Sequence, residues 1–204
     1  MIPPLCFITD AGAPRSALAQ AEAAARAGAP WIQLRDKTLA DADFARLARE
    51  MSDRLAPLGA KLFLNDRVDV ALALRTDGLH IGQSDGDPAL IRDLIGPEMI
   101  LGLSVDTDAQ LAAIPEGIVD YLGIGPVRAT ASKSDHATPL GLEGAARIIA
   151  RTALPCLAIG GLTHADTAPL KAAGAAGMAV VSAISRAPDM GLATAEILQA
   201  WSRA

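Results

Sequence analysis

Two acids follow neighbouring apolar runs of the sequence, at positions where a sheet could bring them together. Asp66 comes after the run 62–64, and Asp85 comes after the run 78–82. The segment 68–74 between the runs is compatible with a helix, so the unit is predicted to be two parallel strands joined by a right-handed helical crossover. Both acids would then leave the same end of one sheet.

Such a pair of carboxylates predicts a metal site. The two acids would repel each other unless a cation lay between them, and hard oxygen ligands suit Mg²⁺. We therefore expect Asp66 and Asp85 to bind magnesium. The alternative is that Asp66 caps the next helix and Asp85 caps a turn, since Asp is favoured at both places. His80, His136 and His164 have no metal-ligand spacing to one another, and structural roles are expected for them.

Composition and charge narrow the class of protein. The chain has 204 residues, of which 51% are hydrophobic and 18 are glycine, which favours an α/β fold with a full core. The net charge is -5 and no Lys/Arg cluster is present, so nucleic-acid binding has no electrostatic support. Any anionic ligand must be held by locally placed bases.

Neither an export signal nor a membrane span is expected from the sequence. Residues 1–10 lack a basic region ahead of an apolar stretch, and no apolar run approaches the about 18 residues that a span requires. A cytoplasmic protein is the expectation. Cys6 and Cys156 lie in apolar runs, which favours buried reduced thiols over a disulfide, a metal ligand or a nucleophile.

Short apolar runs alternate with helical patterns along the whole chain. Eight strands are predicted, at 5–8, 31–34, 62–64, 78–81, 100–103, 121–124, 156–159 and 178–181. Further helical spacing occurs at 15–27, 41–58, 88–95, 142–151 and 163–173. Eight repeats of this length predict one α/β domain over residues 1–204, a closed parallel (βα)8 TIM barrel. A doubly wound open sheet is the rival, but no glycine-rich loop follows the first strand.

In such a barrel the chemistry lies where strands end. After the second strand, alternation sends Gln33, Arg35 and Lys37 to one side and Leu34 and Asp36 to the other. Arg35 can grip phosphate oxygens as a fork while Lys37 supplies a point charge. The alternative is a solvated surface pair with Asp36.

The later strand ends add hydroxyls and small residues. Ser104 follows the fifth strand, either as a ligand or as a cap of the next helix. The segment 125–141 is long and unpatterned, and its Thr130, Ser132 and Lys133 favour a lid that closes over phosphate. After the last two strands come Gly160, Gly161, Val181 and Ser182, where backbone N–H groups can approach a second anion.

These motifs together resemble thiamine phosphate synthases. The resemblance is carried, in order, by QLRDK at 33–37, NDRVD at 65–69, DGLHIGQSD at 77–85, GLS at 102–104, GIGPV at 123–127 with its T-x-S-K, AIGG at 158–161 and AVVSAI at 179–184. It runs over almost the whole chain and covers seven of the eight strand ends.

The resemblance implies a (βα)8 barrel that joins a pyrimidine pyrophosphate to a thiazole phosphate with loss of pyrophosphate. It implies magnesium on Asp66 and Asp85. The implied contacts of the pyrimidine pyrophosphate are Gln33, Leu34, Arg35, Asp36, Lys37, Asn65, Ser104 and Lys133. Of these, the implied catalytic residues are Arg35, Lys37, Ser104 and Lys133. The implied contacts of the thiazole phosphate are Thr130, Ala131, Ser132, Gly161, Val181 and Ser182.

This reaction fits the residue chemistry. A metal with Arg and Lys can stabilise a departing pyrophosphate, so that a pyrimidinylmethyl cation forms before the thiazole nitrogen attacks. The chain departs from the family's pattern before the loop threonine, where Arg128 and Ala129 replace a frequent aromatic residue and proline. Ser132 replaces a frequent threonine but keeps the hydroxyl, so we expect its phosphate contact to persist.

Two other functions compete with the synthase. Thiazole tautomerases are relatives that tend to lack both acids and to carry a histidine where this chain has Pro126. A barrel that binds phosphorylated ligands without turnover is the third hypothesis. The presence of both acids together with Arg35, Lys37 and Lys133 favours the synthase. Small phosphorylated substrates are the expected partners, and amphipathic barrel helices are compatible with a homodimer.

Overall fold

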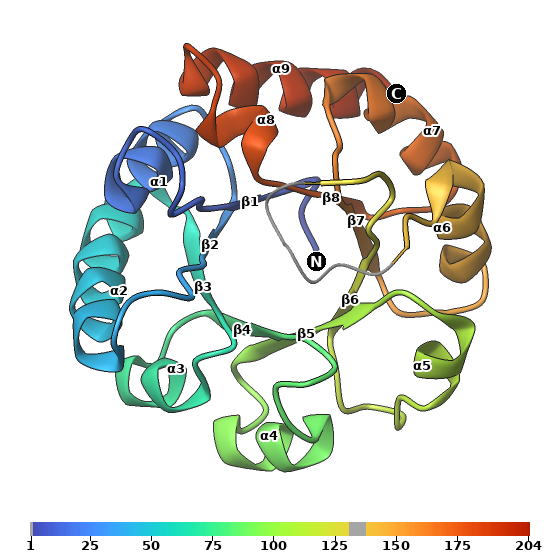
Figure 1. Cartoon of the computed structure of the whole chain (residues 1–204), viewed down its shortest axis with the longest axis horizontal. Helices are drawn as coiled ribbons and strands as arrows, with labels where there is room; N and C mark the ends of the chain where they lie inside the picture. The colour runs from blue at the N-terminus through green and yellow to red at the C-terminus, as the bar shows by residue number, and fades with distance from the viewer. Residues whose placement is uncertain (1, 131–137) are drawn as a thin grey trace.

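Eight parallel strands close into a barrel in the computed structural model, which describes residues 2–130 and 138–204 (Figure 1). Each strand pairs with the next in the chain, and β8 pairs with β1. The strands are β1 (Leu5–Ile8), β2 (Trp31–Leu34), β3 (Lys61–Asn65), β4 (Gly78–Ile81), β5 (Ile100–Val105), β6 (Tyr121–Ile124), β7 (Cys156–Ile159) and β8 (Gly177–Val180). The predicted (βα)8 barrel is confirmed, and five of the eight strands have the predicted bounds.

Helices form a ring outside the strands (Figure 1). Those of the described residues are α1 (Ala17–Arg26), α2 (Asp41–Leu55), η1 (Ala56–Leu58), α3 (Val68–Leu74), α4 (Pro88–Ile95), α5 (Asp108–Ala112), α6 (Gly141–Ile149), η2 (His164–Asp166), α7 (Thr167–Ala172), α8 (Ser182–Ser185) and α9 (Met190–Arg203). The predicted helix 163–173 is divided into η2 and α7, and a capping box of Thr163 and Asp166 begins η2. No helix within 2–130 or 138–204 has the length and hydrophobicity needed to cross a bilayer.

Alternation along the strands divides the core into two layers. Residues such as Leu5, Phe7 and Leu34 face outward and pack under the helices in the larger apolar cluster. The inward-facing side chains form a second cluster inside the barrel, made of Cys6, Ile8, Trp31, Phe63, Tyr121, Leu157 and Ala179. The barrel is therefore filled by side chains at this level, as expected for eight strands.

Both cysteines are buried and free of disulfides, as predicted. Cys6 faces the barrel interior and Cys156 faces the helices. Burial raises the pKa of each thiol to about 12, so neither is a ready thiolate nucleophile at neutral pH.

Glycines on neighbouring strands make room for the interior rings. A Cβ added at Gly78 would lie 2.1 Å from the Phe63 ring, and one added at Gly102 would lie 2.1 Å from the Tyr121 ring. Trp31 and Phe63 have their ring centroids 4.1 Å apart and complete the layer. Phe63 on β3 thus fills the space beside Gly78 on β4, and Tyr121 on β6 fills the space beside Gly102 on β5, because the glycines have no side chain.

We expect Gly78→Ala to destabilise the protein, because the new methyl group overlaps the Phe63 ring and both lie in a filled barrel. The free energy of unfolding should fall by about 1–3 kcal/mol, measured by urea denaturation. Gly191→Ala in α9 is the control, because the nearest atom to its new Cβ is Asp189 Oδ1 at 3.3 Å. The free energy of unfolding of this variant should stay within about 1 kcal/mol of the wild-type value. Equal stability of Gly78→Ala and the wild type would contradict this packing.

Candidate active site

A cavity of about 420 Å³ opens at the carboxyl ends of the strands, and residues of all eight strands line it. Most of the residues expected at the site are among its lining residues. They are Gln33, Arg35, Lys37, Asn65, Asp66, Asp85, Ser104, Thr130, Gly161, Val181 and Ser182. The closed barrel therefore brings together side chains that lie far apart in the sequence.

Two residues from the second strand end do not line this cavity. Leu34 is fully buried in the outer apolar cluster. The Asp36 carboxylate accepts hydrogen bonds from the Thr38 N–H at 2.8 Å and from the Leu39 N–H at 3.0 Å. Alternation on the strand sends these two side chains away from Gln33 and Arg35. Ala131, Ser132 and Lys133 lie outside the described residues, as does the rest of the segment 131–137 of the proposed lid.

Asp66 reaches the cavity through an unusual backbone conformation. Its φ is 57°, in the left-handed region that Asp tolerates better than most side chains. Its N–H donates to the His80 carbonyl at 3.0 Å, which ties the end of β3 to β4. Arg67 precedes α3 without a capping side chain, so Asp66 is not the cap of that helix.

The two acids influence each other across the cavity. Burial raises the pKa of the Asp66 carboxyl above its usual value, and the negative charge of Asp85 raises it further, whereas Arg67 and Lys37 lower it. Asp85 also accepts the Gly82 N–H at 2.6 Å, so it closes a turn as well as facing the cavity. The pair is thus close enough for repulsion to be felt, and a cation would relieve it.

Arg67, which the sequence reasoning did not single out, links the acid to the loop after β2. Its Nε lies 3.4 Å from Asp66 Oδ1, and its Nη1 is paired with Asp41 at the start of α2. Its Nη2 donates to the carbonyls of Asp36 at 3.4 Å and Leu39 at 3.0 Å. The loop that carries Lys37 is therefore anchored beside Asp66.

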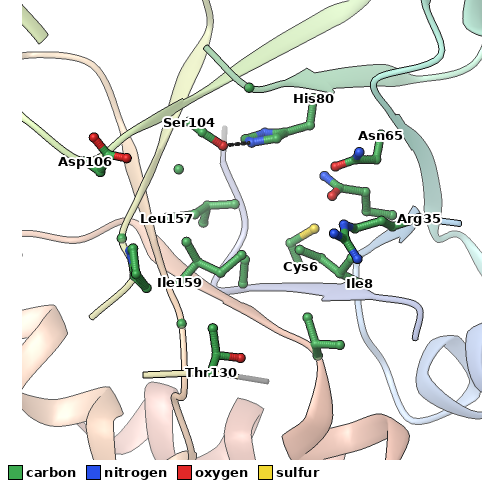
Figure 2. Close-up of a pocket in the computed structure, with 18 of the residues that line it drawn as sticks. Cys6, Ile8, Arg35, Asn65, His80, Ser104, Asp106, Thr130, Leu157 and Ile159 are labelled. Carbon is green, nitrogen blue, oxygen red and sulfur yellow. Dashed lines mark hydrogen bonds between the residues drawn. The ribbon is translucent and has the colours of Figure 1, made fainter. Parts of the chain in front are cut away.

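His80 lies in the cavity wall beside Ser104 (Figure 2), and its other ring nitrogen contacts Tyr121. Its Nδ1 is 2.9 Å from the Tyr121 hydroxyl and its Nε2 is 2.9 Å from Ser104 Oγ. Burial raises the pKa of Tyr121 well above its usual value, so the phenol keeps a proton that it can donate to Nδ1. In that arrangement a neutral imidazole would carry its proton on Nε2 and donate it to Ser104, whose own hydroxyl could then donate to a ligand.

Ser104 does not cap a helix. It lies within β5, and the following helix α5 begins at Asp108 with Thr107 as its cap. The cap prediction fails because β5 continues two residues beyond its expected end, to Val105. Ser104 instead faces the barrel interior, where alternation along β5 puts it on the same side as Gly102.

The cavity has a polar side and an apolar side (Figure 2). Arg35, Asn65, His80 and Ser104 bring polar groups from β2 to β5. The apolar side is formed by Cys6, Ile8, Leu157, Ile159 and Ala179. Asp106 adds a third acid at the rim. Sequence reasoning did not assign His80, Tyr121 or Asp106 to the site, although two-residue alternation from Gly78 would have pointed to His80.

The donor set fits magnesium better than a metal that needs a complete protein cage. Within the described ranges, no three or more His, Cys, Asp or Glu side chains are grouped to hold a metal ion. Mg²⁺ is commonly held by one or two carboxylates together with water and substrate phosphates. Asp66 and Asp85 provide that number of carboxylates at one cavity.

Comparison with known proteins was made with the sequence and with the structure. The family model described as thiamine monophosphate synthase matches residues 5–184. The thiamine-phosphate synthase of Xanthobacter autotrophicus is 47% identical over 187 residues, which cover 91% of this chain and 89% of the relative. That of Azorhizobium caulinodans is 44% identical over 188 residues, with the same coverage of 91% and 89%.

A solved structure of a thiamine phosphate pyrophosphorylase from Pyrococcus furiosus gives the same result. It superimposes with a TM-score of 0.87 and is 31% identical, covering 98% of this chain and 96% of that one. The sequence and the fold agree over nearly the entire length. The chain belongs to the thiamine monophosphate synthase family.

Proposed function

We propose that this protein is a thiamine-phosphate synthase, a transferase. It joins 4-amino-2-methyl-5-(diphosphooxymethyl)pyrimidine to 4-methyl-5-(2-phosphooxyethyl)thiazole and releases pyrophosphate. The observation that carries the proposal is the meeting of Asp66, Asp85, Arg35 and Lys37 at one cavity, with the relatives' activity behind it. In the reaction the C–O bond to pyrophosphate breaks with its electron pair, and the thiazole nitrogen forms the new C–N bond.

The charged side of the cavity suits the leaving pyrophosphate. Arg35 and Lys37 offer hydrogen bonds and positive charge, and Asn65 lies beside them. Asn65 Nδ2 also donates to Asp66 Oδ2 at 2.8 Å, which orients the acid. A magnesium ion bound by Asp66 and Asp85 would supply further charge stabilisation to pyrophosphate. Lys133, outside the described residues, is expected to join this group from the lid.

The apolar side suits a short-lived carbocation. Ile8, Leu157, Ile159 and Ala179 keep water from the electrophilic carbon, which water would otherwise capture. Gln33, which is 2% exposed, can hydrogen-bond the pyrimidine against this wall. The Ser104 proton, directed by His80, is available to an acceptor on the same substrate. These residues position and shield the reactants.

The opposite end of the cavity suits the thiazole phosphate. Thr130, Gly161, Val181 and Ser182 line it, with Ala131 and Ser132 expected to join them from the lid. Their hydroxyl and main-chain groups are donors that bind phosphate without adding charge. The homodimer and the cytoplasmic location stay sequence-based expectations.

The two alternatives explain the cavity less well. A tautomerase has no leaving pyrophosphate and so no use for two acids beside Arg35 and Lys37. A barrel that only binds ligands has no need of the Asp66 backbone conformation, which costs conformational energy and is typical of functional positions. Binding of both substrates without product would support the sensor alternative over ours.

Pyrophosphate release tests the proposal and its metal. With magnesium and both precursors, the purified protein should release pyrophosphate and form thiamine phosphate. Asp66→Ala should lower turnover by about 100-fold or more, since it removes about 2.7 kcal/mol or more of charge stabilisation at the transition state. Circular dichroism should show an intact fold.

Asp69→Asn is the matched control for that experiment. Asp69 lies three positions further along, is exposed on α3 and does not line the cavity. Its replacement should leave turnover near the wild-type value. Turnover that is unaffected by a chelator would remove magnesium from the proposed mechanism, and wild-type protein without pyrophosphate release would overturn the proposed function.

The Tyr121 hydroxyl should influence catalysis through its hydrogen bond to His80. Tyr121→Phe keeps the ring against Gly102 but removes the donor that fixes the His80 tautomer. We expect kcat/KM for the pyrimidine substrate to fall about tenfold, corresponding to one hydrogen bond of about 1.4 kcal/mol. The same replacement in a Ser104→Ala background should have little further effect. An unchanged kcat/KM for Tyr121→Phe alone would refute the tautomer assignment.

A further inference from the structure

An ion pair joins the loops that follow β6 and β7, just outside the cavity. Arg128 Nη2 lies 2.6 Å from Asp166 Oδ1. The Asp166 side chain is only 7% exposed, whereas that of Arg128 is 46% exposed. Neither residue lines the cavity. By the resemblance noted in the sequence, Arg128 stands at a position where an aromatic residue is frequent.

The two oxygens of Asp166 hold different parts of the structure. Oδ1 binds Arg128, while Oδ2 accepts the Thr163 N–H at 2.8 Å and lies 3.4 Å from the Thr163 hydroxyl. Burial by itself raises the Asp166 pKa, but hydrogen bonds from Arg128 and Thr163 outweigh it and hold the pKa below its usual value. The carboxylate is therefore ionised at neutral pH and bridges the two loops.

The same loops are also packed backbone against backbone. The Val127 N–H donates to the Ile159 carbonyl at 2.8 Å, and the Arg128 N–H donates to the Gly160 carbonyl at 3.0 Å. Gly161 has a φ of 63°, and a Cβ there would lie 2.9 Å from Arg128 Cβ and 3.0 Å from the Ala129 carbonyl oxygen. These backbone contacts hold the two loops together, and the Arg128 side chain adds the ion pair to them.

Both loops carry residues of the anion end of the cavity. Thr130 follows Arg128 by two positions, and Gly160 and Gly161 precede Asp166 on the other loop. We propose that the Arg128–Asp166 ion pair is a positioning device, which fixes the separation of Thr130 and Gly161 that the thiazole phosphate requires. The inference rests on the proposed function and adds to it a pair of residues that do not touch the substrate.

Breaking the ion pair should weaken binding of the thiazole phosphate and leave binding of the pyrimidine pyrophosphate unchanged. For Arg128→Ala we expect the KM for the thiazole phosphate to rise about tenfold, because misplaced donors bind the phosphate less well. The KM for the pyrimidine pyrophosphate, varied at saturating thiazole phosphate, should stay within about twofold of the wild type, since its contacts lie on other strands. Arg128→Lys keeps the positive charge but loses the forked geometry of the guanidinium. Its KM for the thiazole phosphate should lie between those of the wild type and Arg128→Ala.

A double-mutant cycle separates the ion pair from the cap of η2. Asp166→Asn preserves the shape and one acceptor oxygen but removes the charge. It should raise the KM for the thiazole phosphate as Arg128→Ala does, and the double variant should be no worse than either single one. Arg128→Phe restores the family's frequent residue type and tests the charge: its KM should remain raised, because Asp166 would still lack its partner.

Arg46→Ala is the matched control. It breaks a surface ion pair of similar length, 2.7 Å to Asp43, on α2 at the opposite side of the barrel from α6 and α7 (Figure 1). Both KM values should stay at the wild-type level. Unchanged KM values for Arg128→Ala, or equal increases for both substrates, would overturn the inference.

The role of the ion pair can be tested even if the proposed synthase activity is wrong. Should the wild type release no pyrophosphate, the proposed synthase activity is wrong, and calorimetry of thiazole phosphate binding still tests the pair. Weaker binding by Arg128→Ala than by the wild type and Arg46→Ala would support the positioning role. Equal binding by all three proteins would refute it.

Discussion

The two-residue alternation of strands in a closed barrel is the constraint on which the structure depends. Every second side chain faces the helices and the others share one narrow interior, so each strand has few positions available for chemistry. On β2, Trp31 fills the apolar layer and Gln33, two residues on, reaches the cavity. On β3, Phe63 and Asn65 repeat this step. The packed layer is thus the floor of the site.

The acids above this packed layer are less stable in their charged form. Asp66 is partly removed from water and lies near Asp85, and both effects disfavour its charged form. Arg67 offsets part of this cost while also holding the loop after β2. One guanidinium therefore couples the acid's ionisation to the placement of Lys37. The remaining repulsion between Asp66 and Asp85 is what the proposed magnesium ion would relieve.

The sequence predicted the fold well because both signals that define it are local. Apolar runs bounded by polar residues gave the strands, and the residues near the end of each run gave eleven of the cavity's lining residues. The contacts of His80 were not predictable in this way, since Tyr121 and Ser104 lie 41 and 24 residues away. Their meeting requires the registers of β4 with β5 and β5 with β6, which only the closed sheet defines. Helix α9 was not predicted, although its buried residues Met190, Thr194, Ile197 and Trp201 recur at helical spacing.

The two ends of the cavity meet different physical demands. Pyrophosphate gains charge as its bond breaks, so cations there stabilise the transition state more than the bound substrate, which is the condition for catalysis. The thiazole phosphate keeps its charge throughout, so cations on it would tighten binding without accelerating the reaction. Neutral donors near Thr130 and Gly161 suit this role, provided that they are well placed. The charges of Arg128 and Asp166 are directed at each other outside the cavity, so the pair serves placement and adds no charge to the phosphate's own contacts.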